Sequence, residues 1–335
     1  MPVALARPDP FDPALRERRV RRGAFIDRGR RLRVDLVNNM PDKALFATQR
    51  QFVKLLEEGA RGHEVTLGLL TLKSVARSAE ARAEMAPLYR APVNMQSAPP
   101  DAVIFTGAEP RAPELDQEPY WGELTALFDM ARAQTFSTLA SCLAAHALVL
   151  HRDDVRRRRF PNKWSGLYPS SLVTPHALTR GLQPGPVPHS RWNGLDEAEL
   201  VAKGYLILTR AAQAGVDMFV KDDDHLTLLF QGHPEYDGDT LAREYRRDVG
   251  RAVEGGRRPV PPVHYFDLAT ERRLESHFER VLKGEEAPHL PKSALAAPQA
   301  DWRARAGRVV ENWLNEISSR KQAASGASLR VRFGG

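Results

Sequence analysis

Apolar segments of strand length alternate with amphipathic segments of helix length in the first half of the chain, and this order restricts the folds open to it. The predicted strands span 32–38, 64–70, 102–106 and 135–141, and the predicted helices span 44–58, 121–133 and 143–151. Residues 102–106 (AVIFT) have no polar face, which is typical of a central parallel strand covered on both sides. The order therefore predicts a doubly wound α/β fold, with a mostly parallel sheet and helices on both faces.

The second half of the chain shows a less regular pattern. Residues 152–200 are rich in Pro, Gly, Ser and Arg, and we expect them to form insertions over the carboxyl ends of the strands, above the active site. Residues 204–233 return to strand-like alternation, and 238–253 form a charged helix. Residues 255–300 are ambiguous, and a further helix is expected over 301–318.

Basic residues gather at the two ends of the chain. The sequence has 49 Lys and Arg against 42 Asp and Glu, a net charge of +7. Residues 1–33 carry ten arginines and four acids, and 318–335 carry four basic residues and no acid, which leaves 34–317 at −3. We therefore expect a basic arm over 1–31, one domain over 32–317 and a basic, low-complexity tail over 318–335. A mildly acidic body does not favour nucleic-acid binding.

The single cysteine, Cys142, excludes an internal disulfide bond and a zinc site made of several thiolates. No apolar run reaches the roughly 18 residues that span a bilayer, and no signal-peptide core follows the N-terminal arginines. A cytoplasmic protein without membrane contact is expected. Sequence motifs for nucleotide hydrolysis, dinucleotide binding and zinc proteolysis of the H-E-x-x-H type are absent, so we expect no metal and no bound cofactor.

Cys142 stands at the junction of a predicted strand and a predicted helix, in the run TLASCLAA (138–145). A side chain on a sharp strand-to-helix turn stands above the sheet, and the free amides and dipole of the helix N-terminus stabilise a thiolate there. This placement predicts a nucleophile. A buried structural cysteine would fit this segment equally well.

A second strand-like run ends in Gly232-His233-Pro234-Glu235. Proline disfavours the helical conformation for the residue before it, so His233 should be extended and Glu235 should point to the same side. A carboxylate there can hold an imidazole that acts as a general base, which predicts a Cys142, His233 and Glu235 triad. The motif alone could be a surface turn, but two such motifs at strand ends in one sheet favour a catalytic site.

A third strand ends in the small-residue loop Thr106-Gly107-Ala108. In this fold the backbone N–H of Ala108 could form an oxyanion hole together with the backbone N–H of Leu143. The alternative is an ordinary turn at the end of a strand.

Taken together, these features resemble the class I glutamine amidotransferase fold, and the surrounding motifs are similar to those of the homoserine O-succinyltransferases. The similar motifs, in the order and approximate spacing of that family, are NNMPDK (38–43), QFVKLL (51–56), PYW (119–121), SGLY (165–168), PHAL (175–178), PHSR (188–191), GHPEYD (232–237) and EYRRDV (244–249). The resemblance covers residues 32–317.

This resemblance implies an acyl-CoA-dependent O-acyltransferase of methionine biosynthesis, most simply a homoserine O-succinyltransferase. In its ping-pong reaction Cys142 would accept the acyl group as a thioester, His233 would carry the proton and Glu235 would orient His233. Acyl-CoA, with succinyl-CoA favoured, would be the co-substrate, and homoserine or a similar hydroxy amino acid the acceptor. The family also implies a homodimer.

The resemblance further assigns Lys163, Ser190 and Arg247 to substrate binding. A guanidinium group such as that of Arg247 suits a carboxylate, and Lys163 and Ser190 can donate hydrogen bonds around the acyl centre. Without the resemblance, a solvated or salt-bridged surface residue would be the expectation at all three positions.

Two positions and one segment depart from the family pattern. Arg111 occupies the position that the family uses to sort acyl donors, where a small residue accompanies succinyl and glutamate accompanies acetyl. It could pair with the free carboxylate of a succinyl group, fill the pocket or face the acceptor. Leu143 replaces a tryptophan, and 156–161 (RRRRFP) has no family counterpart. The alternatives to a homoserine O-succinyltransferase are a homologue with another donor or acceptor, a glutamine amidotransferase and a catalytically silent binding module.

Three further signals have simpler interpretations. His146 follows Cys142 by one helical turn, but a histidine packed under the sheet is favoured over one that approaches the thiol. Residues 222–225 (DDDH) are consecutive and predict a polar hairpin turn instead of a metal site. The arginines at 156–159 predict a solvated loop, with contact to the phosphates of CoA as the functional alternative.

Overall fold

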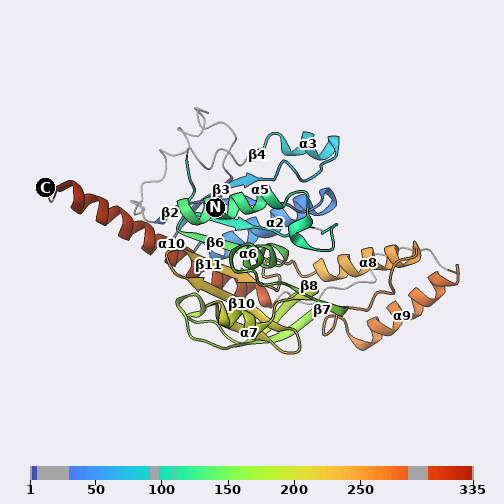
Figure 1. Cartoon of the computed structure of the whole chain (residues 1–335). Coiled ribbons are helices and arrows are strands. Elements are labelled where there is room, and N and C mark those ends of the chain that lie inside the picture. Colours follow the sequence, from blue (N-terminus) through green and yellow to red (C-terminus); the bar gives the residue numbers. More distant parts are fainter. Residues whose placement is uncertain (1, 6–29, 91–97, 109, 286–300, 334–335) are drawn as a thin grey trace.

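The computed structural model describes residues 2–5, 30–90, 98–108, 110–285 and 301–333 (Figure 1). Its described part contains an eleven-stranded sheet in the order β1-β3-β2-β5-β6-β11-β10-β9-β7-β8, with β4 paired to β3. The strands are β1 (Val3–Leu5), β2 (Arg31–Val37), β3 (Glu64–Leu70), β4 (Tyr89–Arg90), β5 (Ala102–Phe105), β6 (Ser137–Ser141), β7 (Arg158–Leu172), β8 (Gly185–Gly194), β9 (Leu206–Ala211), β10 (Gly215–Asp222) and β11 (Leu226–Phe230).

Helices and short 3₁₀ turns connect these strands. They are α2 (Asp42–Gly59), α3 (Ala79–Met85), η2 (Leu115–Gln117), α5 (Trp121–Gln134), α6 (Leu143–Asp153), η3 (Ala177–Thr179), α7 (Glu197–Ala202), α8 (Thr240–Val253), α9 (Leu268–Leu282) and α10 (Trp302–Phe333). Within the described residues, no helix combines the length and the apolar character needed to cross a membrane.

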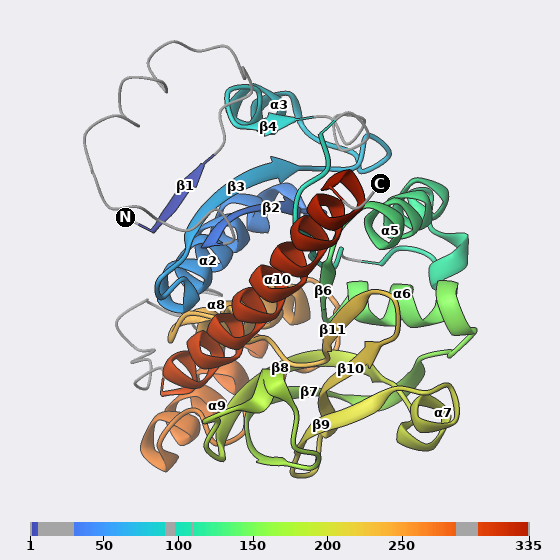
Figure 2. The same ribbon diagram turned by 90° about the vertical axis from the view of Figure 1, so that its left-hand side faces the viewer.

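The parallel strands are buried between two layers of helices, as the sequence predicts. Ile104 of β5 faces a core formed with Phe52 of α2 and Trp313 of α10, and its neighbours on β5 face a second core with Phe128 of α5 and Leu148 of α6. Figure 2 shows α10 running across one face of the sheet. Because successive side chains of a strand point to opposite faces, a strand that is apolar throughout fits this two-sided burial. The predicted doubly wound α/β fold is confirmed.

The parallel order brings four strand ends together. β2, β5, β6 and β11 are neighbours that run in the same direction, so the residues that follow them emerge at one edge of the sheet. Cys142 follows β6, the loop at 106–108 follows β5, and His233 lies three residues after β11. Ligand sites of open α/β sheets lie at this carboxyl edge.

Residues 152–200 have more regular structure than their sequence pattern indicates. Most of them form β7 and β8, a long antiparallel pair that joins the sheet through the pairing of β7 with β9. Four prolines and an irregular register between Arg159 and Trp164 interrupt the alternation of apolar and polar residues that identifies a strand. The pair carries Lys163 and Ser190, two predicted substrate residues.

The two termini also differ from their predicted character. Val3–Leu5 pairs in parallel with β3, and the rest of the predicted N-terminal arm lies outside the described residues. The helix predicted to end near 318 continues to Phe333, so the first part of the predicted tail is helical. Arg320 pairs with Asp222 at 2.7 Å and Lys321 with Asp101 at 2.8 Å, which attaches this basic segment to the body.

Candidate active site

Cys142 occupies a strained turn between β6 and α6. Its backbone has φ 51° and ψ −110°, which a non-glycine residue adopts only when the surrounding structure enforces it. The Cys142 N–H donates to the Phe230 carbonyl of β11 at 2.8 Å, and the β6–β11 pairing holds the turn from the same side. The thiol is partly exposed at the first turn of α6, where helix amides favour a negative charge.

His233 and Glu235 lie side by side after β11. The His233 Nδ1 is 2.8 Å from the Glu235 Oε1, and both side chains are nearly buried. The His233 N–H donates to the Pro188 carbonyl of β8 at 2.8 Å, which fixes the backbone of this turn. Within the described residues the His233 Nε2 has no hydrogen-bond partner, so it is free to exchange a proton with a bound substrate.

The charges around His233 favour its protonated form. Burial by itself lowers the pKa of His233, but the neighbouring Cys142 thiolate and the Glu235 carboxylate outweigh burial and hold the pKa well above its usual range. Cys142 and Glu235 therefore both lie close enough to His233 to raise its pKa, so the three predicted triad residues come together.

The N-terminus of α10 holds the backbone of the triad loop, a contact that sequence reasoning missed. The Trp302 indole N–H donates to the Tyr236 carbonyl at 3.0 Å, and the Arg303 Nη1 donates to the Glu235 carbonyl at 3.0 Å. Arg303 also pairs with Glu58 of α2 at 2.9 Å. Since these residues are about 70 to 180 positions from the triad, no local pattern marks them.

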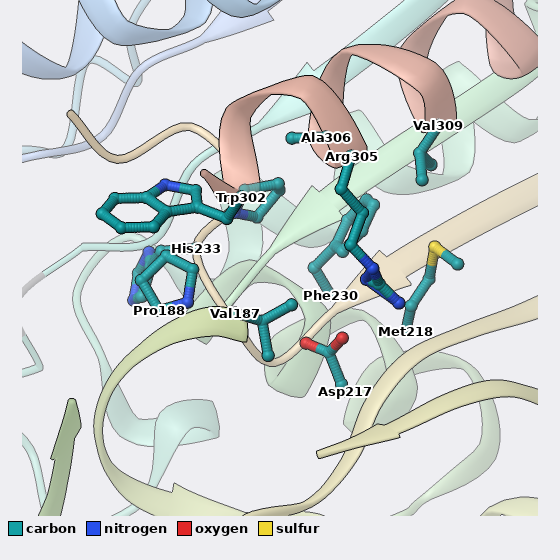
Figure 3. Close-up of a pocket in the computed structure, with 11 residues that line it drawn as sticks. Val187, Pro188, Asp217, Met218, Phe230, His233, Trp302, Arg305, Ala306 and Val309 are labelled. Carbon is teal, nitrogen blue, oxygen red and sulfur yellow. The ribbon is translucent and has the colours of Figure 1, made fainter. Parts of the chain in front are cut away.

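A cavity lined by His233 lies between β8, β10 and the start of α10, and its labelled residues are drawn in Figure 3. Asp217 of β10 and Arg305 of α10 project into it from opposite walls. Asp217 accepts hydrogen bonds from Thr209 at 2.9 Å and Ser170 at 3.3 Å. Burial raises the pKa of Asp217, against the opposing effect of Arg305.

The loop after β5 lies against the first turn of α6. A Cβ atom on Gly107 would come within 3.0 Å of the Leu143 Cβ and 3.4 Å of the Leu143 N, so glycine permits this close approach. Ala108 and Leu143 line the same cavity, and Leu143 directly follows Cys142 in the sequence. The oxyanion hole expected from the backbone N–H groups of these two residues stays a prediction.

The three predicted substrate residues meet in one polar cluster with two acids of α8. Lys163 Nζ lies 2.8 Å from Asp248 Oδ2 and 3.5 Å from Glu244 Oε2. Ser190 Oγ donates to Glu244 Oε2, and Arg247 donates to Asp248 Oδ1 at 3.0 Å. The cluster joins β7, β8 and α8, which are far apart in sequence.

Glu244 links this cluster to the triad. The Tyr236 hydroxyl donates to Glu244 Oε1 at 2.9 Å, and the Tyr236 ring stacks on the His233 ring at 4.2 Å. Burial raises the pKa of Glu244, but Lys163, Arg247 and Ser190 outweigh burial and hold this pKa below its usual value. The carboxylate is therefore ionised. Sequence reasoning did not assign a role to Glu244. Its place three residues before Arg247 on one helix face was the available signal.

Among the described contacts, none joins Arg111 to this cluster. It is exposed on the loop after β5, and its backbone N–H donates to Glu118 Oε1 at 2.6 Å. Among the described contacts, none joins the Arg111 side chain to a triad residue. Its role in sorting acyl donors stays a prediction.

The simpler interpretations of His146 and of residues 222–225 are confirmed. His146 is buried and its Nε2 lies 3.1 Å from Gln231 Oε1, and burial lowers its pKa to about 3. Residues 222–225 connect β10 to β11 in an antiparallel hairpin, where Asp222, Asp223 and Asp224 pair with arginines. Among the described residues, no cluster of three or more His, Cys, Asp or Glu could hold a metal ion.

Residues 19–323 match the model of the homoserine O-succinyltransferase family. A homoserine O-succinyltransferase of Methylorubrum extorquens is 44% identical over 304 residues, which cover 88% of this chain and 90% of that protein. A homoserine O-succinyltransferase of Rhodopseudomonas palustris is 44% identical over 296 residues, which cover 86% of this chain and 89% of that protein.

Comparison with solved structures gives the fold. A glutamine amidotransferase from Methylobacillus flagellatus has a TM-score of 0.52 and 16% identity, with 86% of this chain and 95% of that chain covered. At this identity the similarity concerns architecture alone. It agrees with the predicted class I glutamine amidotransferase-like fold.

Proposed function

Because the chain belongs to the homoserine O-succinyltransferase family, we propose that it transfers a succinyl group from succinyl-CoA to homoserine through a thioester on Cys142. The observation that carries the proposal is the Cys142 turn beside the His233–Glu235 pair, whose Nδ1 to Oε1 distance is 2.8 Å. This arrangement pairs a thiolate nucleophile with an imidazole held in one orientation by a buried carboxylate.

In the first half-reaction the Cys142 thiolate attacks the thioester carbonyl of succinyl-CoA. The new C–Sγ bond forms, the bond from carbon to the CoA sulfur breaks, and the departing CoA thiolate takes the proton of the His233 imidazolium. The backbone N–H groups of Ala108 and Leu143 would stabilise the oxyanion between these events.

In the second half-reaction the homoserine hydroxyl gives its proton to His233 and attacks the acyl-enzyme. The C–O bond forms, the C–Sγ bond breaks, and Cys142 leaves as the thiolate. Acylation removes the charge of Cys142, which is the strongest cause that raises the pKa of His233. The pKa of His233 therefore falls in the acyl-enzyme, which turns the same imidazole from an acid into a base.

Lys163, Ser190 and Arg247 would bind the two substrates from one side of the triad. Arg247 is about half exposed. One edge of its guanidinium pairs with Asp248, and the free edge can bind the carboxylate of homoserine. Arg111 would meet the free carboxylate of the succinyl group.

A cytoplasmic homodimer remains the prediction from the sequence.

The proposal is tested by intact mass spectrometry of the protein after incubation with succinyl-CoA, acetyl-CoA or glutamine. We expect a succinyl adduct that peptide mapping places on Cys142 and that homoserine discharges as O-succinylhomoserine. An acetyl adduct without a succinyl adduct would show that acetyl-CoA, and not succinyl-CoA, is the acyl donor. Release of ammonia from glutamine would favour an amidotransferase, and the absence of any adduct would favour a binding module.

We expect Glu244→Gln to lower kcat/KM for homoserine about 10-fold to 100-fold, because hydrogen bonds to a charged group contribute about 1.5–3 kcal/mol. The variant keeps the shape but removes the charge that organises Lys163, Ser190 and Tyr236. Steady-state kinetics with varied homoserine measure the effect. Glu254→Gln, at the exposed C-terminal end of the same helix, is the matched control. Equal kinetics for the two variants would contradict the proposed role.

A further inference from the structure

Two arginines without a described acidic partner lie against the ring of Trp192. The Arg159 guanidinium carbon is 4.6 Å from the centroid of the indole ring, and that of Arg257 is 5.5 Å from it. Both arginines are exposed, and within the described part of the chain no acidic side chain pairs with either. Cations lie favourably on an indole face, but two of them on one ring repel each other.

The neighbouring arginines of the run at 156–159 differ in this respect. Arg156 pairs with Asp116 at 3.3 Å, and Arg158 pairs with Asp196 at 3.0 Å and Glu199 at 2.5 Å. Their charges are compensated at the surface. Arg159 is thus the exposed member of the run that keeps its positive charge for another group.

The ring that carries both arginines lies near Ser190, a member of the polar cluster around Glu244. Trp192 follows Ser190 by two residues on β8, so the two side chains point to the same side of the strand with their Cα atoms about 7 Å apart. Arg191, between them, points the other way, to His189. Arg159 comes from β7 and Arg257 from the segment after α8, so three separate segments converge on one indole.

We propose that Arg159 and Arg257, held on Trp192, bind the phosphate groups of the CoA part of the acyl donor. This inference rests on the proposed function, since it takes an acyl-CoA as the substrate. A guanidinium offers a planar pair of donors that matches a phosphate, and an anion shared by the two arginines removes their mutual repulsion. The position along β8 places the phosphates beyond Ser190 while the thioester lies at Cys142.

Isothermal titration calorimetry tests the site with CoA itself, and with pantetheine, which has no phosphate. We expect wild-type protein to bind CoA more tightly than pantetheine, and Arg159→Gln and Arg257→Gln each to weaken CoA about tenfold. Arg158→Gln, whose charge is already paired, is the matched control and should change CoA affinity less than about twofold. The wild-type affinity for CoA should also fall as salt is raised from about 50 to 300 mM.

The site is overturned if both variants bind CoA as the wild type does, if pantetheine binds as tightly as CoA, or if the wild type binds no CoA. An affinity for CoA that does not fall with salt would also overturn the site, and this measurement needs no variant, so it stands even if one variant fails to fold. Binding is measured without turnover, which separates the two proposals. Arginine-dependent CoA binding without succinyl transfer would refute the proposed function and support the phosphate site.

Discussion

Replacing Cys142 by alanine is expected to lower the kcat of succinyl transfer at least about 10⁴-fold, because loss of a nucleophile removes the covalent route altogether. Release of the CoA thiol and formation of O-succinylhomoserine measure the effect, and intact mass should show no succinyl adduct. Cys142 occupies a strained backbone conformation at φ 51°, so the small alanine side chain leaves the turn in place.

Two further variants make this result specific to the thiol. Cys142→Ser keeps the shape and offers a weaker nucleophile, so it should also be nearly inactive at neutral pH. Ser141→Ala changes the preceding buried residue and should keep most of the activity. Turnover by Cys142→Ala within about tenfold of wild type would refute a cysteine mechanism, because binding alone cannot supply that rate.

His233→Asn is expected to slow both half-reactions about 10³-fold, within the usual range for loss of a general acid or base. Rapid-quench mass spectrometry can follow acylation by succinyl-CoA and discharge by homoserine separately. The matched control is His151→Asn at the far end of α6, where His151 pairs with Asp129 at 2.8 Å. This control removes an imidazole without touching the triad.

In the wild type, the rates of acylation and of discharge should depend on pH in opposite directions, because they need different protonation states of His233. Free enzyme holds His233 protonated because its pKa is raised, so acylation should persist through neutral pH and fall only as pH rises through that raised pKa. Discharge needs neutral His233, so it should fall as pH is lowered. His233→Asn should lose both pH dependences. Identical pH profiles for the two half-reactions in the wild type would contradict the change of role.

The sequence by itself determined the architecture and the position of Cys142, the proposed nucleophile. The predicted strand over 64–70 has the bounds of β3, and the run TLASCLAA placed Cys142 at the junction of β6 and α6. Both depend on local properties, since apolar periodicity and strand-ending residues act over a few positions. His233 and Glu235 were found for the same reason, because they are two residues apart.

Only the tertiary structure decided how these parts meet. Lys163, Ser190 and Glu244 come from β7, β8 and α8, and Trp302 and Arg303 reach the triad loop from the start of α10. These residues are brought together by strand register, by the antiparallel β7–β8 pair and by the packing of α10 across the sheet (Figure 2). Such contacts join positions dozens of residues apart, so they depend on global packing, which leaves no periodic signal in the chain.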